Sequence, residues 1–172
     1  MVSYELFTLF HLMILSRTGQ YAIQALIVLA MRPRGEPVLN RELAQHLNVP
    51  PAYLAKVLQS LGKGNLLYSF RGRHGGFCLR EGGEKTDLMR ILLLTEGEEF
   101  AQNCVLGLKE CGDDTACLMH CEWKTIKQDI VYFLHQQTLE KMAESLRSGK
   151  YKLADMPLAL ISTAYSDNSD SE

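Results

Sequence analysis

The chain has 172 residues, of which 47% are hydrophobic and 22% charged, which fits one domain with an appended element or two small domains. No apolar run approaches the roughly 18–20 residues of a membrane span, and the first residues lack the features of a secretory signal. We therefore expect a cytoplasmic protein with no membrane partner. Thiols stay reduced there, so the four clustered cysteines among the five are better interpreted as metal ligands or redox groups than as disulfides.

The formal net charge of −2 hides an asymmetry along the chain. Residues 13–85 hold ten Lys/Arg and four Asp/Glu, a charge of +6, whereas residues 86–172 hold eight and fifteen, a charge of −7. Such a split indicates a basic surface that meets a polyanion, carried by one region of a chain that is not itself cationic.

Residues 1–12 are apolar and show no helix cap, so we interpret them either as a misassigned start, with Met13 as the natural first residue, or as a helical extension. A helical pattern follows, which Ser16 or Thr18 can cap and in which apolar residues recur every three or four positions. The breaker cluster at residues 32–35 must end this helix.

Two short helices come next. Asn40 is expected to cap a helix over residues 41–47, and residues 48–50 form a turn. Pro51 suits the first turn of a second helix, in which Leu54, Val57, Leu58 and Leu61 mark the buried face. Two helices joined by a short turn are typical of a helix-turn-helix, although many helical hairpins share this pattern.

The segment after these helices predicts a β-hairpin. Residues 66–70 and 77–79 are short β-type runs, and the connection between them is rich in glycine and carries Arg71, Arg73 and His74. A helix-turn-helix followed by a basic hairpin predicts a winged helix, whose wing tip lies along DNA phosphates or in the minor groove. A solvated hairpin with incidental arginines is the alternative.

The predicted fold class is mainly α: a winged helix-turn-helix DNA-binding domain at residues 13–97 and a long C-terminal dimerisation helix at residues 123–147. Thr86 or Asp87 caps a helix that ends near Gly97. The residue 123–147 segment has an apolar stripe and lacks Gly and Pro, and a helix that long would leave its stripe exposed, so we expect it to pair with a second copy. Residues 148–172 are expected to be disordered.

Between these parts, residues 98–122 form a cysteine-rich loop. Cys104, Cys111, Cys117, His120 and Cys121 fall within eighteen residues. Thiolates and imidazole bind both zinc and iron–sulfur clusters, and the spacing alone favours the two equally. Structural zinc sites usually contain a C-x2-C pair, which is absent from this loop. Cys78 stands apart in the hairpin and is most simply a small core residue.

On the second helix of the helix-turn-helix, Tyr53, Lys56 and Gln59 share one solvent face and are the candidates for base contacts. Arg71 at the wing is the strongest single candidate for DNA binding. Lys63, Arg73 and His74 are expected to touch phosphates, which set affinity and salt dependence rather than sequence preference. For each helix residue the alternative is a solvated surface side chain.

These motifs together resemble the Rrf-two family of bacterial winged-helix regulators. The matching residues are Leu15-Ser16-x3-Gln20-Tyr21-Ala22, Leu43-Ala44, Tyr53-Leu54, Arg71-Gly72-x2-Gly75-Gly76-Phe77, Glu96-Gly97 and His120-x2-Trp123. The resemblance covers about residues 13–147, and the loop is most similar to that of the iron–sulfur cluster assembly regulators. It implies a homodimeric transcription factor that binds a double-stranded DNA operator and carries a [2Fe–2S] cluster.

The resemblance also implies a ligand set. Cys104, Cys111 and Cys117 match the family's ligand cysteines and His120 its histidine, with Cys121 as the alternative fourth ligand. The gap between Cys104 and Cys111 is one residue longer than the family pattern. Some relatives take a carboxylate from the residue before Tyr21, but here that residue is Gln20, a poor ligand.

The functional expectation is a transcriptional regulator whose operator binding responds to an iron–sulfur cluster. The alternative is a zinc-stabilised or metal-free scaffold, or a metal-trafficking protein, without a DNA role. An enzyme is not expected, because no nucleophile–base pair, P-loop or dinucleotide fingerprint occurs in the sequence.

Overall fold

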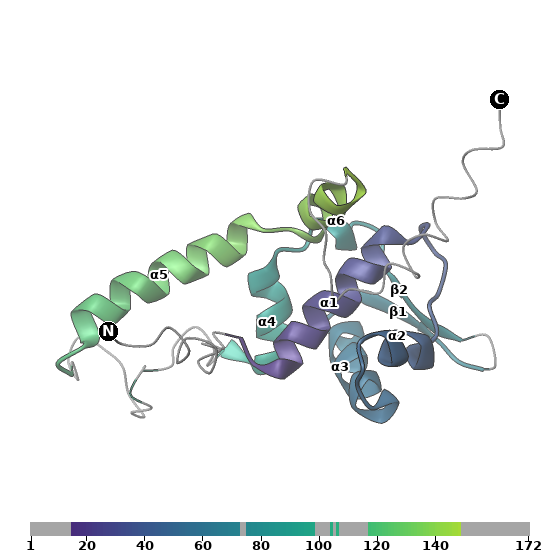
Figure 1. Ribbon diagram of the computed structural model, residues 1–172, viewed down its shortest axis with the longest axis horizontal. Coiled ribbons are helices and arrows are strands. Elements are labelled where there is room, and N and C mark those ends of the chain that lie inside the picture. Colours follow the sequence, from purple (N-terminus) through teal and green to yellow (C-terminus); the bar gives the residue numbers. More distant parts are fainter. Residues whose placement is uncertain (1–14, 73–74, 99–103, 105, 107–116, 149–172) are drawn as a thin grey trace, which may run out of the picture.

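The computed structural model describes residues 15–72, 75–98, 104, 106 and 117–148. The expectations for residues 1–12 and 149–172 lie outside these ranges. Within them the chain is mainly helical with one small two-stranded sheet (Figure 1). The elements are α1 (Arg17–Met31), α2 (Asn40–His46), α3 (Pro51–Lys63), β1 (Leu67–Phe70), β2 (Gly76–Leu79), the 3₁₀ turn η2 (Gly83–Lys85), α4 (Leu88–Glu96), α5 (His120–Gln136) and α6 (Leu139–Arg147).

Helix α1 is the centre of the core. Ser16 caps it, because the Gly19 amide donates to the Ser16 hydroxyl at 3.1 Å, and the helix ends before Pro33 as predicted. Its apolar positions are buried against α3, α4, α6 and β2. On the α4 side the approach is close: a Cβ at Gly19 would lie 2.2 Å from the Glu96 carboxylate and 2.6 Å from the Leu92 side chain, so a larger residue would have to displace them.

The helix-turn-helix consists of α2 and α3. The predicted buried face of α3 is confirmed, since Leu54, Val57, Leu58 and Leu61 are all buried and Pro51 lies in the first turn. The predicted cap at Asn40 is wrong. Leu39 holds the cap position without a side-chain bond, and the Asn40 amide instead donates to the carbonyl of Pro51 at 2.9 Å. This residue therefore ties the two helices together, which local spacing could not reveal.

Strands β1 and β2 form the predicted hairpin, antiparallel and in register from Leu67 opposite Leu79 to Phe70 opposite Gly76. Val38, from the α1–α2 connection, pairs with Phe77 through two backbone hydrogen bonds of 2.9 Å each. A Cβ at Gly76 would lie 2.2 Å from the Val38 carbonyl oxygen, so glycine permits this third segment to approach. Cys78 is 3% exposed, which agrees with its interpretation as a core residue.

The single helix expected over residues 123–147 is wrong. Helix α5 stops at Gln136, Gln137 is extended, and Thr138 caps α6 by accepting from the Lys141 amide at 3.3 Å. The break is stabilised from elsewhere in the chain, because Leu88 N donates to Gln137 O at 2.9 Å and Leu139 N donates to Thr86 O at 3.1 Å. These bonds replace helix bonds that an uninterrupted helix would make.

The two halves of that segment behave differently. Helix α6 returns to the body and packs on α1 and η2, whereas α5 extends away from the body as a separate arm (Figure 1). Only His120 and Leu134 are buried among the residues of α5. No helix in the described ranges combines the length and the apolar character that crossing a bilayer requires.

Candidate DNA-binding surface and cysteine-rich segment

The predicted contact residues of α3 lie on its solvent face. Tyr53, Lys56, Gln59 and Lys63 are all exposed, opposite the buried leucines. The face is therefore polar, with two cations and one amide available to a partner. This is the chemistry that reads base edges and phosphates in the major groove.

Tyr53 has a second role that the sequence did not suggest. Its hydroxyl lies 2.6 Å from the Thr18 hydroxyl, and its ring meets Tyr21 edge-on with centroids 6.2 Å apart. Tyr53 thus fixes the start of α3 to the start of α1 while staying 38% exposed. Thr18, first considered as a cap, is instead a positioning partner of the recognition helix.

The wing tip is built from tight backbone geometry. Gly72 has φ +100°, and the Gly75 amide donates to the Gly72 carbonyl at 3.0 Å. Arg71 is exposed at the end of β1. Arg73 and His74 lie outside the described residues, so their predicted phosphate contacts stay predictions.

One feature of the wing was missed by sequence reasoning. Tyr68 and Phe70 are 44% and 46% exposed on β1, and their ring centroids are 6.4 Å apart. The Arg80 guanidinium lies 4.3 Å above the Tyr68 ring, a cation–π contact. Alternation along a short strand could have indicated that residues 68 and 70 share a face.

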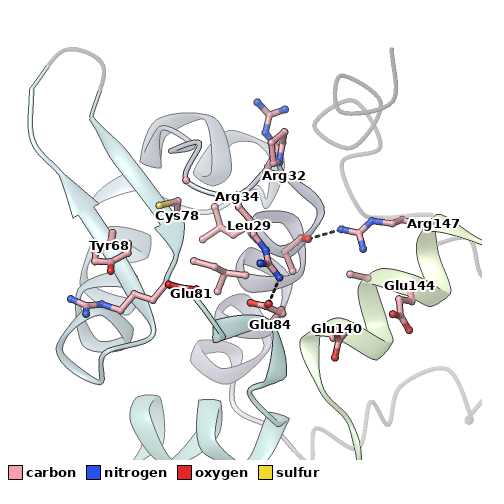
Figure 2. A pocket seen from close by; sticks show the side chains of 16 residues that line it. Leu29, Arg32, Arg34, Tyr68, Cys78, Glu81, Glu84, Glu140, Glu144 and Arg147 are labelled. Carbon is pink, nitrogen blue, oxygen red and sulfur yellow. Dashed lines mark hydrogen bonds and ion pairs between the residues drawn. The ribbon is translucent and has the colours of Figure 1, made fainter. Parts of the chain in front are cut away.

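A cavity of about 530 Å³ lies between the wing, the end of α1 and α6 (Figure 2). Two of its arginines make hydrogen bonds across it. Arg34 donates to Glu84 at 2.5 Å, and Arg147 of α6 reaches across to the Ala30 carbonyl at 2.8 Å. The Arg147 bond attaches α6 to the body, whereas the Arg34–Glu84 pair links the α1–α2 connection to η2. Cys78 lines the same cavity, where burial raises the pKa of its thiol.

The cysteine-rich segment is described only in part. Cys104 and His120 are buried at 9% and 6% exposure, Cys117 is half-buried and Cys121 is exposed. The His120 amide donates to the Cys117 carbonyl at 3.0 Å, which joins the loop to the first turn of α5. Cys111 lies outside the described residues. Among the residues that are described, no three His, Cys, Asp or Glu side chains converge as a metal site.

The donors themselves suit a soft metal centre. Two thiols and an imidazole, two of the three buried, are groups that bind iron–sulfur clusters or zinc when deprotonated. His120 is 6% exposed in the first turn of α5, a helix in which Leu134 is the other buried residue. The Gln20 amide, at the position of the alternative carboxylate ligand, donates to the Leu15 carbonyl at 3.1 Å.

A helix-turn-helix followed by a short antiparallel hairpin defines the winged-helix class of DNA-binding proteins. The family model of the Rrf2 iron-dependent transcriptional regulators matches residues 15–145 of this chain. The chain therefore belongs to the Rrf2 family, the Rrf-two family of the sequence resemblance. Regulators of this family bind DNA, and the chain is accordingly a transcriptional regulator rather than an enzyme.

Relatives agree with this assignment. The chain is 32% identical over 132 residues to a provisionally named HTH-type transcriptional regulator of Aquifex aeolicus, covering 76% of this chain and 91% of the relative. It is 25% identical over 131 residues to the HTH-type transcriptional regulator IscR of Pectobacterium atrosepticum, covering 76% and 79%.

Solved structures share the fold. CymR, the global cysteine regulator of B. subtilis, matches with a TM-score of 0.60 and 27% identity over 76% of this chain and 95% of its own. IscR of T. potens matches with a TM-score of 0.62 and 25% identity over 81% and 93%. The mainly α, winged-helix part of the predicted fold class is thereby confirmed, whereas the predicted long C-terminal helix is divided into α5 and α6.

Proposed function

We propose that this regulator binds a double-stranded DNA operator as a homodimer, and that a [2Fe–2S] cluster modulates its operator affinity. The observation that carries the proposal is the position of His120. It is buried, it opens the arm helix α5, and it follows Cys117 by three residues. A metal centre there would lie at the end of the element that joins the loop to the DNA-binding body.

The cluster would be held by Cys104, Cys111, Cys117 and His120. His120 is favoured over Cys121 as fourth ligand because Cys121 is exposed whereas His120 and Cys104 are buried. The description of the family as iron-dependent supports iron over zinc. Such a cluster supplies a one-electron redox couple whose potential histidine ligation raises. Zinc held by the same donors is the alternative.

DNA would be read by α3 and the wing. Tyr53, Lys56 and Gln59 face the major groove, with Gln59 suited to adenine and Lys56 to guanine or phosphate. Lys63, Arg71, Arg73 and His74 would contact the backbone or the minor groove. Support comes from the exposure of the five residues that lie in the described ranges and from their position in the helix-turn-helix and wing.

The homodimer would form along α5. Ile126, Tyr132 and Phe133 are 50%, 68% and 58% exposed on an arm that touches the body mainly through α4. Large apolar side chains on an isolated helix favour a partner helix with the same surface. Pairing two arms would fix the distance between the two α3 helices, and half-site spacing constrains operator choice.

The cluster is tested by purification without oxygen. We expect coloured protein with visible charge-transfer bands and about two iron and two sulfide per subunit, the composition of such a cluster. Cys117→Ala should lose most of the colour, whereas Cys78→Ala, a cysteine remote from the loop in sequence, should keep it. Colourless protein with stoichiometric zinc would overturn the iron–sulfur proposal and favour the zinc-stabilised alternative.

DNA binding is tested by a gel-shift assay on a duplex enriched by the protein from a random-sequence pool. Arg71→Ala should weaken binding about tenfold and reduce the salt dependence, because a phosphate or base contact is lost. Lys141→Ala is the matched control, since this exposed cation lies on α6, on the other side of the body from α3 (Figure 1). Failure to enrich any duplex would favour a scaffold role.

A further inference from the structure

Helix α5 ends beside the start of α4, and the contact there is continuous with the end of the recognition helix. His135 Nδ1 lies 3.2 Å from Asp87 Oδ2. The other oxygen of Asp87 accepts from the Arg90 amide at 2.8 Å and so caps α4. The Arg90 guanidinium in turn donates to the Gly64 carbonyl at 3.4 Å, and Gly64 is the residue that ends α3.

The geometry points to a relay in which Asp87 and Arg90 position the recognition helix according to the placement of the arm. We call His135, Asp87, Arg90 and Gly64 the α5–α3 relay. It rests on the proposed function in one respect, because it gives α5 a physical route to the DNA-binding face. Asp87 and Arg90 are positioning residues: neither belongs to the DNA-contact or cluster residues named above.

Two observations support a mechanical connection rather than a chance surface pair. The joint is reinforced by backbone, since residues 86–88 and 137–139 exchange two hydrogen bonds as an antiparallel bridge. At the other end α4 meets α3 closely, because a Cβ at Gly64 would lie 2.4 Å from a methyl of Leu94. A shift of the arm at this joint would therefore act on α4, which packs on the end of α3.

Helix α5 spans the whole distance from the cysteine-rich loop to the contact with α4. Helix α5 has 17 residues and is therefore about 25 Å long. Its first residue is His120 and its last turn contains His135. Rotation at the loop end is carried along a continuous helix to the joint. Coupling of this kind requires a contiguous element with two arrangements, and it is demonstrated by energetic non-additivity.

The test is a double-mutant cycle on operator affinity. His135→Ala removes the donor at the arm. Arg90→Met removes the guanidinium but keeps the backbone amide that Asp87 caps and a side chain of similar helix propensity. Binding to the enriched duplex is measured for wild type, both single variants and the double variant, with the metal-free and the anaerobically purified full-length protein.

We expect the double variant to bind about two- to fivefold more tightly than the product of the single effects predicts, a size suited to partly exposed pairs. Additive effects would overturn the relay, because loss of the Arg90 charge alone weakens DNA binding independently of His135. Arg147→Met is the matched control. It also removes a guanidinium that donates to a backbone carbonyl, that of Ala30, but it lies off the relay, so its cycle with His135→Ala should be additive.

A second pair of variants separates the cap from the link. Asp87→Ser keeps a strong helix cap but is too short to reach His135, so it should reproduce His135→Ala, whereas Asp87→Ala should also lower thermal stability. If wild-type protein binds DNA equally with and without its cluster, the cluster proposal fails while the cycle still decides the relay. If wild-type binding depends on the cluster but the effects of the two substitutions are additive, the relay is overturned and the cluster proposal stands.

Discussion

The winged-helix body and the α5 arm are held in place by different means. The body surrounds α1 with buried residues from α2, α3, α4, α6 and the hairpin, and several of its leucines are completely inaccessible to solvent. The arm buries only two side chains and presents a tyrosine, a phenylalanine and an isoleucine to solvent. The body therefore accounts for its own stability, whereas the arm has an apolar surface suited to a partner.

The largest expected effect lies in the body. Leu58 is fully buried between α3 and the rest of the core, so Leu58→Ala should lower the free energy of unfolding by about 2–5 kcal/mol through lost burial and a residual cavity. Urea denaturation followed by circular dichroism measures it. Leu118→Ala, at a position 92% exposed beside the arm, is the control and should change stability by less than about 0.5 kcal/mol. Similar values for both would contradict the division between body and arm.

An intermediate effect is expected on the arm. Phe133→Glu places a charge on the exposed apolar surface and should weaken the proposed homodimer at least about tenfold, as loss of a large interface anchor does. Analytical ultracentrifugation over a concentration series measures this. Gln128→Glu adds the same charge at another exposed position of α5 and should leave the dimer nearly unchanged. A Phe133→Glu protein that sediments like wild type would place the dimer contact elsewhere.

The next comparison concerns the reactivity of two thiols, one from each region. Burial raises the pKa of Cys78 and keeps reagents away, whereas Cys121 is exposed on the arm. In metal-free protein, iodoacetamide should label Cys121 at least about tenfold faster, since the thiolate is the reactive form. Mass spectrometry of digests taken over time measures both rates. Equal rates at neutral pH would show that the wing base opens readily.

The raised pKa of Cys78 also predicts how the free energy of unfolding changes with pH. Because the folded protein holds the Cys78 proton more tightly than the unfolded chain does, the contribution of this thiol is present below its unfolded pKa. It is lost as the pH rises through the folded value. Alkaline pH should therefore destabilise wild type slightly more than Cys78→Ala.

Sequence reasoning succeeded where structure depends on neighbours in the chain. The cap at Ser16, the stop before Pro33 and the buried face of α3 follow from local spacing. It failed where the partner is remote. The break at Gln137 is stabilised by residues 86–88, and the Asn40 side chain is drawn to Pro51. Thr138 as a cap and Glu140 in the first turn are local signals of a helix start, but the unbroken apolar periodicity outweighed them.

The candidate sites divide in the same way. The exposed face of α3 could be predicted because helical periodicity determines it, and the role of Tyr53 against Thr18 could not, because the two residues lie 35 positions apart. The ligand set was proposed from residue types and a family resemblance. The structure adds that two members of this set, Cys104 and His120, are buried. Cys111 lies outside the described residues.

The pairing of Val38 with Phe77 affects the spacing between the two surfaces that are expected to contact DNA. It joins the base of the wing to the connection between α1 and α2, so the hairpin and the helix-turn-helix share one backbone framework. The distance between Arg71 and the exposed face of α3 is therefore fixed within one chain. In the proposed homodimer, operators would then be distinguished by the distance between their half-sites, while the width of the half-site that each subunit reads would stay the same.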